Sequence, residues 1–266
     1  MSSNNKLPTL VFIHGMWSTQ QVWLHWIKWF QKRGYECLSF DLPGHEQPEV
    51  KNRQPYKLQD YVQFVTKQLR NVKSPVLIGH SLGGLIAQLV ASQTSPSGLV
   101  LVNSAAPGQI FPIRTKVIPG VVRHLLRWGL WKKVFHLSQR EARYLVFNKA
   151  PKTEIENQFP KMTGESGRVF YQVGYGFLNL AGSNRVKTDD VSCPLLLLAG
   201  DKDRIIPVVV SRKAAALYGD RATYQELQNH GHWLIGEHGW KELLSQIDSW
   251  LQTNVNSMSN ETLSSR

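Results

Sequence analysis

The feature that most constrains the fold of this chain is a repeated alternation of short apolar runs and amphipathic stretches. TLVFIH (residues 9–14), SPVLIGH (74–80) and SGLVLVNS (97–104) are apolar without the alternation of a half-exposed strand, which is typical of strands buried on both faces. Helix-like stretches such as 58–70 and 82–93 separate them. Strands joined by helices form right-handed crossovers, so the sequence predicts an α/β fold with a mainly parallel sheet of about six strands flanked by helices.

The alternation stops in the middle of the chain. Residues 107–190 contain no strong strand run but several helix-like stretches, and the strand pattern resumes with CPLLLLAGD at 193–201. We therefore predict a core formed by 1–106 and 191–256, with a helical cap inserted at 107–190. The polar segment 257–266 lacks periodicity and is predicted to be a disordered tail.

Composition limits the class of protein further. The chain has 266 residues and 42% hydrophobic residues, enough for one sizeable core. Its first residues lack the charged and apolar regions of a secretory signal, and no apolar run is long enough to span a membrane. There are 2 cysteines, Cys37 and Cys193, which are too few for a disulfide framework. These features predict a cytoplasmic protein in a reducing setting.

The charge of the chain is concentrated in the predicted cap. Lys and Arg total 31 against 19 Asp and Glu, a net charge of +12, yet from Arg114 to Lys152 the basic residues are opposed by Glu141 alone. Two interpretations stay open. The cap is a cover over a cleft with a solvated basic face, or Trp128 and Trp131 with their basic neighbours form an interfacial helix that gives weak peripheral association with anionic membrane.

Two other partner classes are not expected. No RNA- or DNA-binding motif accompanies the positive charge, so we expect no nucleic-acid partner. HGH at 230–232 lacks the further spaced ligands that a zinc site needs, so we expect no metal.

A serine between two glycines is the first candidate for chemistry. Ser81 lies in Gly79-His80-Ser81-Leu82-Gly83, directly after a predicted buried strand and before a predicted helix. This context is typical of a nucleophile elbow, in which a tight turn exposes the hydroxyl at the top of a sheet. The alternative is that Ser81 merely caps the helix.

A nucleophilic serine needs a base, which is usually a histidine oriented by a carboxylate. Asp201 and Asp203 follow a predicted strand, and His230 and His232 follow the last one. The carboxyl ends of parallel strands share one edge of the sheet, where ligands gather. The chain order is therefore serine, aspartate, histidine, with both pairs left open by position alone.

Five motifs together identify a family resemblance. The chain resembles the α/β-hydrolase superfamily, near its cap-bearing monoglyceride lipases, lysophospholipases and carboxylesterases, through FIHGMW, DLPGH, GHSLGG, AGDKDRIIP and HGHW. The resemblance implies that Asp203 is the acid, His232 the base, and the backbone N–H groups of Met16 and Leu82 the oxyanion hole. It also implies catalysis without a cofactor. Trp17, beside Met16, is a candidate for lining the acyl pocket.

These residues predict a serine hydrolase that cleaves carboxylic esters of acyl or otherwise hydrophobic small molecules through an acyl-enzyme. Fold and triad do not fix the substrate, so carbon–carbon bond hydrolysis, thioester hydrolysis and cofactor-free perhydrolysis stay open. A ligand sensor with low turnover is an alternative from another class of protein.

Overall fold

Six parallel strands form the central sheet of the computed structural model, which describes residues 7–46, 54–110, 115–174 and 182–256. Their order is β2-β1-β3-β4-β7-β8. The strands are β1 (Thr9–Ile13), β2 (Cys37–Ser39), β3 (Pro75–His80), β4 (Gly98–Val102), β7 (Leu195–Gly200) and β8 (Ala222–Leu227). The prediction of a mainly parallel sheet of about six strands flanked by helices is confirmed.

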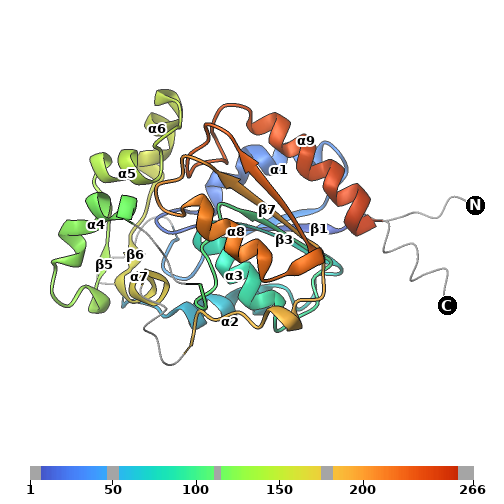
Figure 1. Ribbon diagram of the computed structural model, residues 1–266, viewed down its shortest axis with the longest axis horizontal. Coiled ribbons are helices and arrows are strands. Elements are labelled where there is room, and N and C mark those ends of the chain that lie inside the picture. Colours follow the sequence, from blue (N-terminus) through green and yellow to red (C-terminus); the bar gives the residue numbers. More distant parts are fainter. Residues whose placement is uncertain (1–6, 47–53, 111–114, 175–181, 257–266) are drawn as a thin grey trace, which may run out of the picture.

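Helices cover both faces of the sheet (Figure 1). The helices of the α/β layers are α1 (Leu24–Gln31), α2 (Leu58–Gln68), α3 (Leu82–Ala91), α8 (Val208–Ala216) and α9 (Trp240–Leu251). Side chains of a strand alternate between faces, and the buried core accordingly forms two clusters. Val11 and Leu77 pack with α2 and α3, whereas Leu10 and Val76 pack with α1 and α9.

Burial explains which strands the sequence marks most clearly. Every residue of β1, β4 and β7 is buried, as expected for central strands that are covered on both faces. The outer strands β2 and β8 are shorter or more polar and mostly half-buried.

The chain between β4 and β7 forms a separate layer at one end of the sheet (Figure 1). It contains α4 (Ile118–Leu125), α5 (Gln139–Leu145), α6 (Lys152–Gln158), α7 (Gly167–Gly174), β5 (Val134–Phe135) and β6 (Glu165–Ser166). Strands β5 and β6 pair antiparallel, a detail that the expectation of a purely helical insertion missed. Each has two residues, too few for any strand pattern. We call residues 115–174 of this layer the cap; the predicted tail, 257–266, lies outside the described residues.

Candidate active site

Ser81 occupies a strained turn between β3 and α3. Its backbone has φ 53° and ψ −119°, a conformation that is rare for a residue with a side chain. Ser81 is the N-cap residue of α3, yet its side chain makes no capping hydrogen bond. Helix capping therefore does not account for a serine at this position.

Close packing around the turn requires glycine on both sides of Ser81. A Cβ at Gly79 would lie 2.4 Å from the carbonyl oxygen of Gly83, and a Cβ at Gly83 would lie 2.1 Å from that of Ile13. Gly15 is packed on the turn as well, since its Cβ would lie 3.0 Å from Cβ of Ser81. The loop after β1, which carries Met16, thus lies directly against the elbow that carries Leu82.

His232 and Asp203 form a buried hydrogen bond. Nδ1–H of His232 donates to Oδ2 of Asp203 at 2.7 Å, and the two residues are 2% and 4% exposed. The other carboxylate oxygen accepts the backbone N–H groups of Ile205 and Ile206 at 2.7 and 2.9 Å. The aspartate is therefore fixed in the orientation that holds the imidazole with Nε2 on its far side.

Asp201 and His230, the alternatives to Asp203 and His232, make different contacts. The Asp201 carboxylate accepts a hydrogen bond from the Lys202 ammonium at 2.7 Å. Burial acts to raise the pKa of this carboxyl, but the contact with Lys202 outweighs it and holds the pKa below its usual value. Both ring nitrogens of His230 lie within hydrogen-bond distance of backbone carbonyls, those of Gln228 and His238, at 2.8 and 3.0 Å.

His80 links the elbow to the histidine loop. It immediately precedes Ser81, and its Nε2–H donates to the backbone carbonyl of His232 at 2.8 Å. Burial, with a smaller contribution from the nearby His232, lowers the pKa of His80 to about 3, so the ring stays neutral. The base loop is thereby tied to the residue next to the candidate nucleophile.

Asn103 and Glu237 hold the same loop from the core side. Asn103, at φ 43°, donates Nδ2–H to the carbonyls of Gly231 and His232 at 2.8 and 3.0 Å and accepts the N–H of Gly200 at 2.8 Å. The Glu237 carboxylate, 2% exposed, accepts the N–H groups on either side of His232, from Gly231 at 2.8 Å and Trp233 at 3.2 Å.

Asn148 holds the loop from the cap. Its Oδ1 accepts the N–H of His232 at 3.2 Å, and its Nδ2–H donates to the carbonyl of Lys202 at 2.9 Å. The sequence analysis missed Asn103, Glu237 and Asn148. Only Asn103 carried a signal, an asparagine directly after a buried strand, where this residue type tolerates positive φ.

Trp17 joins the loop after β1 to the cap. The residue has φ 57° and is 5% exposed, and its ring packs edge-on against Phe135 of β5 with centroids 5.6 Å apart. Its carbonyl oxygen accepts the N–H of Thr163 at 3.0 Å. Trp17 therefore lies between the loop that carries Met16 and the cap.

A second buried polar cluster connects the cap to the core. Glu165 of β6, fully buried, lies 3.2 Å from Nε2 of His45 and accepts the Tyr61 hydroxyl at 3.0 Å. Burial disfavours the charged imidazole, but the Glu165 charge and hydrogen bond outweigh it and raise the pKa of His45. The ring of His45 packs on His14, at 5.0 Å between centroids.

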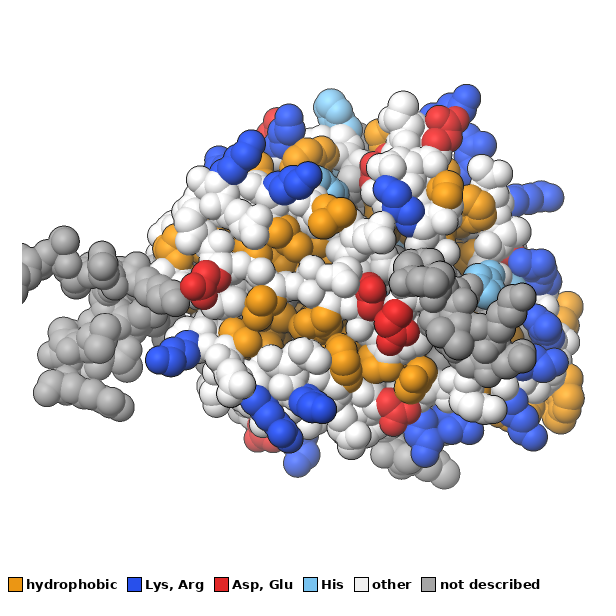
Figure 2. All heavy atoms as spheres, turned by 180° about the vertical axis from the view of Figure 1, so that it is seen from behind, with side chains coloured by type: hydrophobic (Ala, Val, Ile, Leu, Met, Phe, Trp, Pro, Cys, Tyr) orange, Lys and Arg blue, Asp and Glu red, His pale blue; other side chains and the backbone are white. Residues whose placement is uncertain are grey.

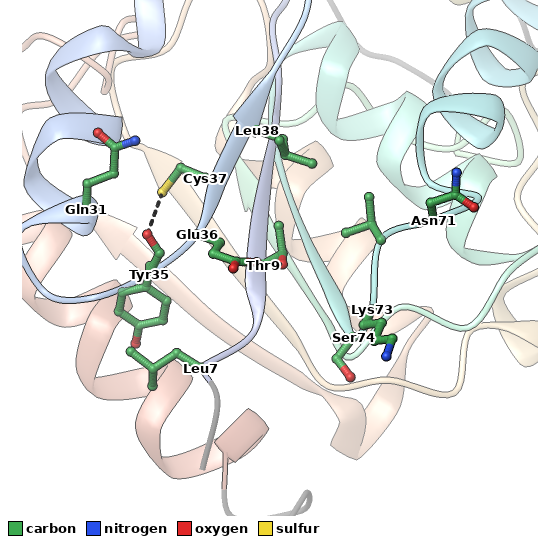
Figure 3. Close-up of a pocket in the computed structure, with 11 residues that line it drawn as sticks. Leu7, Thr9, Gln31, Tyr35, Glu36, Cys37, Leu38, Asn71, Lys73 and Ser74 are labelled. Atoms are coloured by element: carbon green, nitrogen blue, oxygen red, sulfur yellow. Dashed lines mark hydrogen bonds between the residues drawn. The ribbon is translucent and has the colours of Figure 1, made fainter. Parts of the chain in front are cut away.

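Two further observations concern other possible binding sites in the molecule. Among the described residues, no group of three or more His, Cys, Asp and Glu side chains is arranged to hold a metal ion. A pocket of about 850 Å³ lies at the amino-terminal ends of β1 and β3, where Thr9, Glu36 and Ser74 line it (Figure 3). Ser81 follows the opposite end of β3, so this pocket is separate from the candidate site.

Comparison with known proteins decides the family. The model of the alpha/beta hydrolase family matches residues 10–246. The chain belongs to this family. The prediction of the family is confirmed, and with it the prediction that the protein is a hydrolase.

Three similar proteins share limited sequence identity with this chain. A Rhodobacter capsulatus protein, the magnesium-chelatase 30 kDa subunit, is 28% identical over 258 residues, which cover 92% of this chain and 87% of that protein. A Mycoplasma pneumoniae protein named as an esterase/lipase is 34% identical over 89 residues, and the match spans 33% of its length. The solved monoacylglycerol lipase of Paleococcus ferrophilus has 20% identity and a TM-score of 0.69, and 93% of this chain and 97% of that one are covered.

Proposed function

We propose that this alpha/beta hydrolase is a serine hydrolase that cleaves carboxylic esters of acyl or otherwise hydrophobic small molecules. The observation that carries the proposal is the chain of contacts from Asp203 to His232 and from the His232 carbonyl to His80, the residue before Ser81. This arrangement supports Ser81 as nucleophile, His232 as base and Asp203 as the group that orients the base.

The proposed reaction has two steps. Ser81 Oγ forms a bond to the ester carbonyl carbon while its proton passes to Nε2 of His232. The N–H groups of Met16 and Leu82 donate to the oxyanion, which supports a rate gain of about 10²–10³ per donor. The ester C–O bond then breaks, and the departing alcohol takes the proton from His232.

Water completes the cycle without a cofactor. His232 removes a proton from water as the water oxygen attacks the acyl-enzyme, and the carboxylic acid leaves as Ser81 recovers its proton. Acyl substrates are favoured because the apolar rings of Trp17 and Phe135 pack together next to Met16, where an oxyanion donor is proposed. Names of relatives that include esterase, lipase and monoacylglycerol lipase point the same way.

The test is steady-state hydrolysis of p-nitrophenyl esters of increasing acyl length. We expect the parent to turn over and Ser81→Ala to lose turnover and labelling by a fluorophosphonate probe. Ser92→Ala, at the C-terminal end of α3, is the matched control and should keep both. A shift in preferred acyl length in Trp17→Ala would support the pocket assignment.

The alternatives predict other results. A parent that is labelled at Ser81 but cleaves no ester would favour carbon–carbon bond hydrolysis, thioester hydrolysis or perhydrolysis. A parent that is neither labelled nor active would favour the hypothesis of a ligand sensor. Equal activity of the parent and Ser81→Ala would exclude the proposed mechanism.

We also propose that the protein acts in the cytoplasm. Both cysteines are free, as is usual where reducing conditions keep thiols unpaired. Among the described residues, no helix has the length and apolar character to cross a bilayer.

A further inference from the structure

The apolar stripe of α4 is split between the protein interior and solvent. Val121 is 3% exposed and packs in the core cluster, with Val117 one turn before it partly buried. Ile118, Val122 and Leu126 follow each other at intervals of four residues, so they share one face of the helix. Their exposed fractions are 49%, 43% and 81%. The row with Val121 therefore packs in the protein interior, and the row with Ile118, Val122 and Leu126 faces water.

Trp128 lies in the turn that follows α4 and its exposed row. Its side chain is 87% exposed, and its ring lies edge-on to Trp131 with centroids 5.3 Å apart. Half of the large exposed hydrophobic side chains among the described residues lie within residues 118–128. Scattered single hydrophobic residues are ordinary on a protein surface, but their concentration in one short segment is typical of an interaction site.

Positive charge surrounds this row. Lys116, Arg127, Lys132 and Lys133 are exposed, and the single carboxylate of the segment, Glu141, is engaged by Arg123 at 2.6 and 2.7 Å. Figure 2 shows Lys and Arg side chains gathered with hydrophobic side chains at the right-hand edge, which is the cap end of the molecule. The surface thus combines exposed apolar side chains with an excess of cations.

We propose that Ile118, Val122, Leu126 and Trp128 insert into an anionic lipid surface while Lys116, Arg127, Lys132 and Lys133 contact its headgroups. We call these eight residues the docking surface. Apolar side chains with tryptophan and a basic rim are typical of helices that lie in the membrane interface. A symmetric contact with a second copy would bring two positive surfaces together, and nucleic acid offers no hydrocarbon to cover the apolar row.

The first experiment measures binding of the full chain to vesicles by co-sedimentation. We expect binding to vesicles of equal parts phosphatidylcholine and phosphatidylglycerol, and little binding to phosphatidylcholine alone. Each cation near an anionic surface strengthens partitioning about fivefold, so Lys132→Gln/Lys133→Gln should weaken binding about tenfold to thirtyfold. In 1 M salt, where the Debye length is about 3 Å, binding of the parent should fall further than this, because all four cations are screened.

The matched control removes two charges elsewhere. Lys28 and Lys32 are exposed one turn apart on and just after α1, so Lys28→Gln/Lys32→Gln changes the net charge equally but lies outside the cap. This variant should bind as the parent does. Equal weakening by both double variants would overturn the proposal, because net charge rather than the docking surface would then explain binding.

The second experiment tests insertion of the apolar row. Vesicles with brominated acyl chains should quench tryptophan fluorescence of the parent more than that of Trp128→Phe, and Leu126→Ser should weaken binding at unchanged charge. Leu24→Ser, at the 52% exposed Leu24 of α1, is the control and should bind normally.

Three further results would overturn the proposal: no vesicle binding by the parent, no loss of quenching in Trp128→Phe, or self-association through Trp128 in sedimentation without vesicle binding. The last result would assign the surface to a second copy of the chain. Binding is measured without turnover, so the outcome is independent of the proposed esterase activity.

Discussion

Asn148 of the cap accepts a hydrogen bond from the backbone N–H of His232 at 3.2 Å, and the same amide donates to the carbonyl of Lys202, the residue before Asp203, at 2.9 Å. One cap side chain therefore bridges the loop of the proposed base and the loop of the proposed acid. The distance between His232 and Asp203 depends on the relative position of these loops. Through Asn148, the cap contacts both loops of the candidate site.

Loss of this bridge should reduce turnover. We expect Asn148→Ala to lower kcat by about tenfold to a hundredfold with little change in KM, because small displacements of a catalytic group cost rate rather than binding. Asn148→Asp keeps an acceptor for His232 and should be affected less. Asn157→Ala is the control, since that side chain contacts Lys161. Equal rates in Asn148→Ala and the control would contradict the positioning role.

Substitution of Asp203 and of Asp201 should have very different effects on kcat. Asp203→Asn leaves the shape of the site intact but removes the charge that orients His232, and we expect kcat to fall by about 10⁴. Asp201→Asn, which loses a contact with the exposed Lys202, should retain nearly full activity. Steady-state ester hydrolysis compares the two, and comparable losses would mean that Asp203 is not the orienting acid.

Substitution of Glu237 should loosen the base loop. Glu237→Gln has one acceptor oxygen in place of two, so it can serve Gly231 or Trp233 but not both. We expect a fall of about tenfold in kcat, with a larger one in Glu237→Leu, which leaves both buried N–H groups unsatisfied. The exposed Glu242 supplies the control Glu242→Gln. Unchanged kcat in Glu237→Leu would refute the role.

The buried pair of Glu165 and His45 should make stability depend on pH. Because the folded pKa of His45 is raised above the ordinary value of 6.5, its stabilising contribution is complete below that pH and is lost as pH rises through the folded value. Glu165→Gln should therefore lower the free energy of unfolding more at about pH 6 than at about pH 9. Urea unfolding at both pH values measures the difference. A pH-independent loss would show that the pair acts through packing alone.

The elbow should not tolerate a methyl group at Gly83. A Cβ there would meet the backbone of Ile13 and His14, so Gly83→Ala should unfold the elbow and abolish both fluorophosphonate labelling and native stability. Gly174→Ala in α7, where no atom of the described residues lies within 4 Å of the added Cβ, is the control. Wild-type labelling of Gly83→Ala would be inconsistent with the packed turn.

The sequence predicted the sheet and the elbow because both leave local signals. A strand buried on two faces must be apolar throughout, and a tight turn packed on a neighbouring strand must have glycine at Gly79 and Gly83. The sequence could not predict Asn148 as a bridge, because its two partners are 54 and 84 residues away along the chain. The short strands β5 and β6 depend in the same way on pairing across the cap.

The apolar stripe of α4 shows a different limit. The helix is shorter than predicted: it ends at Leu125, so Trp128 and Trp131 follow it and do not belong to one interfacial helix. A stripe two residues wide also does not reveal which row faces the protein. Tertiary packing made that choice, with Val121 placed inside and Leu126 outside. The hypotheses of a cover and of an interfacial helix therefore could not be separated from the sequence.

The insertion of the cap between β4 and β7 also has a consequence for biosynthesis. During translation, β4 leaves the ribosome long before its neighbour β7, since residues 103–194 must be made in between. Until then the nascent sheet has an unpaired apolar edge, and Ser81 has neither aspartate nor histidine beside it. The order of the strands therefore delays completion of the sheet, and the proposed acid and base are made only after β4 and the cap.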